Sequence, residues 1–92
     1  MRIEGELSIY RAAELKAELL AAIKPKATLE VDLSGVTELD SAGVQVLMLA
    51  KRAARDLGGE LKLSAHSPAV VEVFELLDLA AHFGDALLVP SA

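Results

Sequence analysis

The chain has 92 residues and a formal net charge of −5, a size that suits one small domain with a single core. Its 53% hydrophobic content with 3% aromatic residues predicts a folded, mainly aliphatic interior, and its acidic balance argues against nucleic acid as a partner. It has no cysteine for a disulfide or a thiolate metal site, and no signal peptide or apolar run of about 20 residues, so we expect a cytoplasmic protein without membrane insertion.

The first elements expected along the chain are a short strand and an amphipathic helix. Residues 2–7 alternate weakly between apolar and polar side chains, which is typical of a strand, and Ser8 follows as the expected N-cap of a helix. Over residues 9–23 apolar side chains recur at spacings of three and four, which predicts a helix with one apolar face. Pro25 ends this helix, because proline cannot continue the hydrogen-bond ladder.

The middle of the chain predicts a central strand, a turn and a second helix. Residues 28–33 place leucine and valine side chains on one face, as a strand does. Residues 34–40 are interpreted as a turn followed by a short extended approach to the helix. Residues 42–57 then carry an apolar stripe at helical spacing, and the pair Gly58-Gly59 supplies the C-terminal stop.

The C-terminal part of the chain predicts a third strand and a third helix. Residues 60–65 place leucines on one face, and Ser67 and Pro68 are expected as the N-cap and the first residue of the next helix. Residues 79–83 are consistent with a short extra turn of helix. The segment Ala86–Val89 fits either a final edge strand or an ordered tail, and the sequence leaves this choice open.

Helices that alternate with strands at this spacing predict an α/β domain with crossover connections and a largely parallel or mixed sheet. In such sheets ligands and partners are met at strand ends, and Asp40-Ser41-Ala42-Gly43 is the best such end. A helix start there would stabilise a phosphate on Ser41 through unpaired N–H groups and the positive end of the dipole, and Gly43 removes a side chain that would block approach. Plain capping of the helix by Asp40 or Ser41 also explains these residues.

Four blocks of residues, in order and at compatible distances, resemble the STAS domain of bacterial anti-sigma factor antagonists. They are Gly5-Glu6-Leu7, the segment from Val31 to Val44 around Asp40-Ser41, Gly58-Gly59-Glu60-Leu61 and Ser67-Pro68-Ala69-Val70. The resemblance implies one small STAS-like α/β domain over residues 1–92, with a mixed sheet of about four strands and amphipathic helices packed mainly on one face.

In that family the serine directly after the aspartate is phosphorylated, and the corresponding residue here is Ser41. The resemblance implies that the unphosphorylated chain binds an ATPase-type serine kinase that is also an anti-sigma factor. Phosphorylation would release the chain, and a serine phosphatase would restore it. A phosphate adds about −1.5 to −2 charges, which repels a docked partner without a large change of fold. The chain would then be a regulator of transcription rather than an enzyme, acting as a monomer or weak dimer without a cofactor.

Other functions stay open at this point. STAS domains also serve as constitutive interaction subunits in chemotaxis-linked, stress-sensing or lipid-transport assemblies, in which Ser41 would be only a helix cap. A small-ligand sensor or an enzyme has less support, because nothing in the sequence nominates a base for Ser41 or a phosphate-binding glycine loop. His66 and His82 lie too far apart in sequence to suggest a metal pair, so we expect no metal site.

The helix after Ser41 is apolar over more than one face, which indicates a docking surface. Val44 and Met48 fall outside its main stripe, and we predict that they contact a partner together with residues 40–43. The alternative is that neighbouring loops cover both side chains, since methionine is a common gap filler.

Overall fold

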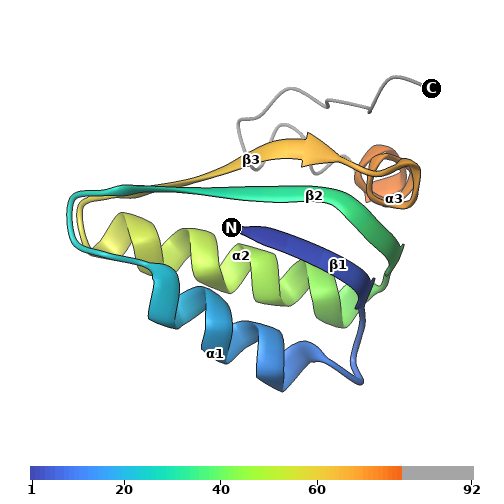
Figure 1. The fold of residues 1–92 in the computed structure, drawn as a ribbon, viewed down its shortest axis with the longest axis horizontal. Coiled ribbons are helices and arrows are strands. Elements are labelled where there is room, and N and C mark those ends of the chain that lie inside the picture. Colours follow the sequence, from blue (N-terminus) through green and yellow to red (C-terminus); the bar gives the residue numbers. More distant parts are fainter. Residues whose placement is uncertain (78–92) are drawn as a thin grey trace.

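The computed structural model describes residues 1–77, which form three strands and three helices that alternate along the chain. This arrangement confirms the predicted small α/β fold. The segments 79–83 and 86–89 lie outside the described residues. The elements, labelled in Figure 1, are β1 (Arg2–Leu7), α1 (Ala12–Ala22), β2 (Thr28–Leu39), α2 (Ser41–Asp56), β3 (Glu60–His66) and α3 (Pro68–Leu77).

The sheet is parallel between its described strands and has the order β1-β2-β3. Because both crossovers step across the sheet in the same direction, two right-handed connections place their helices on the same face. Figure 1 shows α1 and α2 side by side against one face, with α3 at the end of the sheet where the strands finish. α3 contacts β2 and β3. The predicted fourth strand and the mixed character of the sheet are not confirmed within residues 1–77.

β2 differs from expectation because it is one strand of 12 residues rather than a strand followed by a turn. Its first half pairs with β3 and its second half pairs with β1. The Asp32 carboxylate accepts the N–H of Ser34 at 2.8 Å, as it would in a turn, yet the backbone stays extended. The turn predicted within residues 34–40 is therefore wrong, because pairing with a distant strand overrides a local turn signal.

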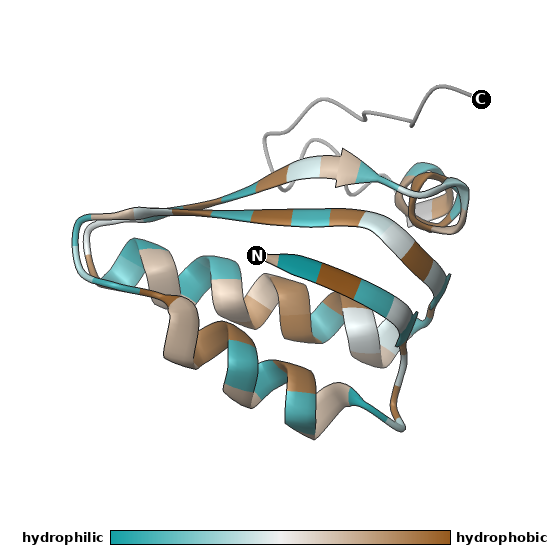
Figure 2. Ribbon diagram, viewed as in Figure 1, coloured by the Kyte–Doolittle hydropathy of each residue, from teal (hydrophilic) through white to brown (hydrophobic). Residues whose placement is uncertain are grey.

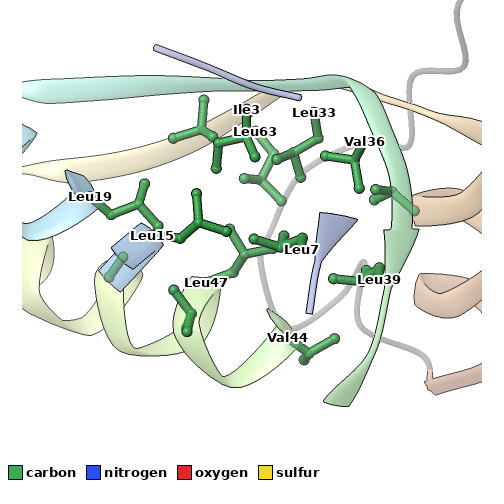
Figure 3. Close-up of a cluster of buried hydrophobic side chains, with 14 of the residues drawn as sticks. Ile3, Leu7, Leu15, Leu19, Leu33, Val36, Leu39, Val44, Leu47 and Leu63 are labelled. Carbon is green, nitrogen blue, oxygen red and sulfur yellow. The ribbon is translucent and has the colours of Figure 1, made fainter. Parts of the chain in front are cut away.

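The hydrophobic core lies between the sheet and the two helices that cover it. Hydrophobic and hydrophilic residues alternate along β2, so one side of the strand faces the helices (Figure 2). Most buried side chains are aliphatic, as the composition predicts. Figure 3 shows side chains of the strands and helices meeting in this layer, among them Ile3, Leu7, Leu15, Leu19, Leu33, Val36, Leu39, Val44, Leu47 and Leu63.

The second and third helices begin close to the predicted positions. α2 starts at Ser41, one residue before the predicted boundary, with Asp40 as its N-cap. α3 starts at Pro68, and the Ser67 hydroxyl accepts the N–H of Val70 at 3.2 Å, as an N-cap does. All three helices begin at the end of the sheet where the strands finish (Figure 1).

α1 begins later than predicted, at Ala12, and the prediction that Ser8 caps it is wrong. Residues 8–11 form a turn in which the N–H of Arg11 donates to the Ser8 carbonyl at 3.0 Å. The Ser8 hydroxyl lies 3.5 Å from a carboxylate oxygen of Glu6 and does not reach the helix. The turn therefore stands between β1 and α1 as a separate segment at the end of the sheet.

Candidate functional site

Three connections meet at the carboxyl end of the parallel sheet, and the predicted site lies among them. They are the turn of residues 8–11 after β1, Asp40 between β2 and α2, and the link from His66 to Ser67 before α3. Such ends are where parallel sheets present their loops and helix N-termini together. The fold therefore brings Asp40 and Ser41 next to a segment that is distant in sequence.

Asp40 joins two of these connections through its carboxylate. Oδ1 accepts the N–H of Gly43 at 2.9 Å, within the first turn of α2, and Oδ2 accepts the N–H of Ile9 at 3.0 Å. The N–H of Asp40 donates to the Leu7 carbonyl at 3.3 Å. The N–H groups of Gly43 and then Ile9 hold the pKa of Asp40 below its ordinary value. The ionised carboxylate thus fixes the turn after β1 to the start of α2.

Ser41 is the first residue of α2, and its side chain is exposed. Among the described residues none forms a hydrogen bond with its hydroxyl, because Asp40 already accepts the capping bond. Ala42, which follows it, is half-buried. The Ser41 hydroxyl therefore faces outward at the positive end of the α2 dipole, where a negative group is stabilised.

Gly43 has a different role from the one expected. It is buried, and a Cβ placed on it would collide with the carbonyl oxygen of Leu7 and lie 2.9 Å from Cδ1 of Leu39. The missing side chain lets α2 approach the end of β1 closely. The prediction that it opens an approach for a partner is wrong, because the space is filled by the protein's own backbone.

The surface prediction for Val44 is also wrong, since this side chain is 5% exposed and belongs to the core. α2 packs against α1 and against the strands, so its buried face is wider than one helical stripe. Met48 is half-buried and packs against the same core. Only Met48 of this pair has surface left for a partner.

Two exposed hydrophobic residues beside Ser41 were not predicted. Ile9 is 67% exposed and Tyr10 is 89% exposed, and the Ile9 N–H is the group bonded to Asp40. Both residues were included in the helix predicted over residues 9–23, although neither lies on its apolar stripe, which contains Leu15. This departure from the helical period was the sequence feature that could have placed both residues outside the helix.

Arg11 fixes the base of this turn. Its guanidinium Nη1 donates to the carbonyls of Glu4 at 2.6 Å and Glu6 at 2.7 Å. These two residues flank Gly5, whose φ of 78° lies in the left-handed region that glycine tolerates. The exposed pair of Ile9 and Tyr10 is therefore held from both sides, by Arg11 on β1 and by Asp40 on α2.

Residues 1–77 offer little for other chemistry. They contain no group of three or more histidine, cysteine, aspartate and glutamate side chains placed to hold a metal ion. His66 is fully buried, and its ring packs edge-on against Phe74 with the ring centres 5.5 Å apart, while His82 lies outside the described residues. Within that same range, every helix is too short or too polar to cross a membrane.

Comparison with known proteins agrees with the architecture. Residues 1–90 match the family described as "Mlab, STAS domain". The chain is 35% identical over 75 residues to the candidate anti-sigma factor antagonist BtrV of Bordetella bronchiseptica, a match that covers 80% of this chain and 65% of that protein. It is 29% identical over 79 residues to the anti-sigma-B factor antagonist of Bacillus subtilis, covering 86% of this chain and 72% of that protein. The chain therefore belongs to the STAS domain family.

Proposed function

We propose that this chain is a partner-switching regulator controlled by phosphorylation of Ser41. The unphosphorylated form binds an anti-sigma factor that is also an ATP-dependent serine kinase, through Ser41 and the start of α2. Phosphorylation releases that partner, and a serine phosphatase restores the binding form. The names of the two relatives, a candidate anti-sigma factor antagonist and an anti-sigma-B factor antagonist, support this class of partner. The need for ATP makes the cytoplasm the expected compartment.

The observation that carries the proposal is that Asp40 caps α2, whereas Ser41 does not. Asp40 makes the capping bond to Gly43, which leaves the neighbouring serine hydroxyl exposed and without a structural duty among the described residues. A kinase can reach a hydroxyl in that position without unfolding the helix. The competing function, a constitutive interaction subunit with Ser41 only as a cap, is less well supported because Ser41 does not cap.

The neighbouring turn suggests how a partner would be held and then released. Ile9 and Tyr10 supply exposed apolar area beside Ser41, and tyrosine is enriched among residues that dominate binding energy. A phosphate on Ser41 would add about −1.5 to −2 charges next to the ionised Asp40. The docking surface would change from apolar with one carboxylate to strongly negative, which weakens binding without a change of fold.

A kinase assay tests the proposal directly. The chain is incubated with ATP and the anti-sigma-type kinase encoded nearest to its gene, and the modified residue is located by mass spectrometry. We expect phosphate on Ser41, none in Ser41→Ala, and normal modification in Ser64→Ala, a matched change of an exposed serine on β3. Modification at another residue, or none with a kinase that is active on its own, would refute the proposal.

Binding to the same kinase completes the test. Ser41→Ala should remain bound in the presence of ATP, and Ser41→Asp should bind more weakly than the wild type. Tyr10→Ala should also weaken binding, by about tenfold, if the turn contributes as proposed. Wild-type affinity in Ser41→Asp would instead favour a constitutive subunit.

A further inference from the structure

The outward side of α2 carries a shallow hollow, which we call the α2 groove. It starts one turn beyond Ser41 and runs toward the C-terminal end of the helix, with a volume of about 330 Å³. From its first to its last residue it spans roughly 15 Å, or about three helical turns. Its lining residues are Gln45, Met48, Leu49, Lys51, Arg52 and Arg55.

The chemistry of the α2 groove changes along its length. Its first half combines the exposed, polar Gln45 with two apolar side chains, Leu49, which is 39% exposed, and Met48, which is half-buried against the core. Its second half is basic, with exposed Arg52 and Arg55. The Lys51 Nζ donates to the Leu61 carbonyl at 3.3 Å, so this side chain lies toward β3.

The charge of the groove is opposite to that of the protein. The chain has a net charge of −5 with nine lysine and arginine residues, and three of these lie on α2 against one acid, Asp56. No ion pair to a carboxylate of residues 1–77 engages Arg52 or Arg55. Cations near a helix C-terminus are stabilised by the dipole, but the dipole does not explain why apolar Leu49 is exposed beside them.

We propose that the α2 groove binds an acidic amphipathic helix of a partner protein. Apolar side chains of that helix cover Met48 and Leu49, and its carboxylates pair with Arg52 and Arg55, in the helix-in-groove mode of recognition. Charge complementarity identifies the occupant, because an acidic segment is repelled by most of this protein and attracted here. The surface is separate from the Ser41 hydroxyl and does not require its phosphorylation.

A defined peptide tests this inference without any kinase. The full chain, labelled with ¹⁵N, is titrated with a synthetic helical peptide of about 14 residues. Leucines form the apolar face of this peptide, and glutamates occupy the remaining positions near one of its ends. A second peptide has lysine in place of each glutamate. We expect NMR shifts at Gln45, Leu49, Arg52 and Arg55 with the acidic peptide only, and weaker binding at higher salt.

Charge reversal on the protein supplies the matched control. Arg52→Glu should weaken binding of the acidic peptide by about tenfold or more, whereas Lys16→Glu, the same charge change on an exposed residue of α1, should leave it within about twofold. Circular dichroism and the urea midpoint confirm that both variants fold. An equal loss in both variants would mean a net-charge effect and would overturn the proposal.

Other outcomes would overturn it as well. These are an absence of shifts with the acidic peptide, equal binding of the lysine peptide, and shifts centred on Ile9 and Ser41 instead of the groove. Binding to vesicles containing phosphatidylglycerol but not to the peptide would assign the groove to an anionic membrane. A concentration-dependent dimer that covers the groove without peptide would assign it to a second copy of the chain.

Discussion

The carboxylate of Asp40 holds two backbone N–H groups, one of which belongs to a residue 31 positions away in sequence. One oxygen accepts the N–H of Gly43 in the first turn of α2, and the other accepts the N–H of Ile9 in the turn after β1. An N-cap residue needs only the first of these bonds. The second bond makes Asp40 the residue that sets the position of Ile9 and Tyr10 relative to Ser41.

Asp40→Asn should keep the capping bond to Gly43 and remove the bond to Ile9. Asparagine caps helices about as well as aspartate, but its amide nitrogen is a donor and cannot accept the Ile9 N–H. We expect faster amide hydrogen exchange at Ile9, measured by NMR, and little change at Gly43. Asp56→Asn, the same charge change at the exposed end of α2, should alter neither amide. Unchanged exchange at Ile9 in Asp40→Asn would show that the bond does not hold the turn.

At the scale of the elements, the close approach of α2 to β1 places the candidate site. The helix can start directly beneath the end of β1 because position 43 has no side chain, and the Leu7 carbonyl occupies that space. The same approach brings the Leu7 carbonyl to the Asp40 N–H. A glycine inside a helix is ordinarily unfavourable, so its presence here reflects packing rather than helix propensity.

Gly43→Ala should therefore destabilise the fold although alanine is the better helix former. We expect a loss of about 1–3 kcal/mol in the free energy of unfolding, measured by urea denaturation. Gly35→Ala is the matched control, because the three atoms nearest to its Cβ would belong to the side chains of Arg2 and Glu4, both of which are exposed and can move. A Gly43→Ala variant as stable as the wild type would mean that the helix shifts without cost.

The helices and strands also show which structural features local sequence patterns can predict. Periodicity predicted every described helix and strand, and the Ser67-Pro68 start was predicted to the residue because a cap is a local interaction. The continuous β2 was not predictable, because its extension past Ser34 depends on pairing with β1. The burial of Val44 was missed for the same reason, since the width of a buried helical face depends on which elements pack around it.

The candidate site was predicted in part. The pattern Asp40-Ser41 located the strand end and the start of α2, and the structure separates the capping aspartate from the exposed serine. The contribution of Ile9 and Tyr10 could not follow from spacing alone, because a hydrogen bond across the end of the sheet positions their turn. The proposed partner contacts therefore come from two segments rather than one.

At the scale of the whole molecule, a small domain has little stability in reserve, so ionisable groups with altered pKa values matter. Folding lowers the pKa of Asp32 below 3.8, chiefly through hydrogen bonds from the Ser34 side chain and backbone, and lowers that of Asp40 through backbone N–H groups. The unfolded chain therefore takes up these protons at a higher pH than the folded chain. The stabilisation is present above the ordinary pKa and is lost as pH falls through the lowered values.

Acid should thus destabilise the wild type more than a variant without these carboxylates. We expect the urea midpoint to fall as pH drops from about 5 to about 2, and to fall less steeply in the double variant Asp32→Asn/Asp40→Asn. Asp56→Asn should keep the wild-type slope. Parallel slopes in the wild type and the double variant would contradict the lowered pKa values.

The guanidinium of Arg11 has a consequence for encounters between copies of the chain. Within residues 1–77 β1 pairs only with β2, so its other side is an edge of the described sheet, and the carbonyls of Glu4 and Glu6 on this strand accept from Arg11 rather than from a neighbouring strand. Arg11 occupies both acceptors. A foreign strand that arrived at this edge would have to displace a charged group that already satisfies it, which protects β1 against edge-to-edge aggregation.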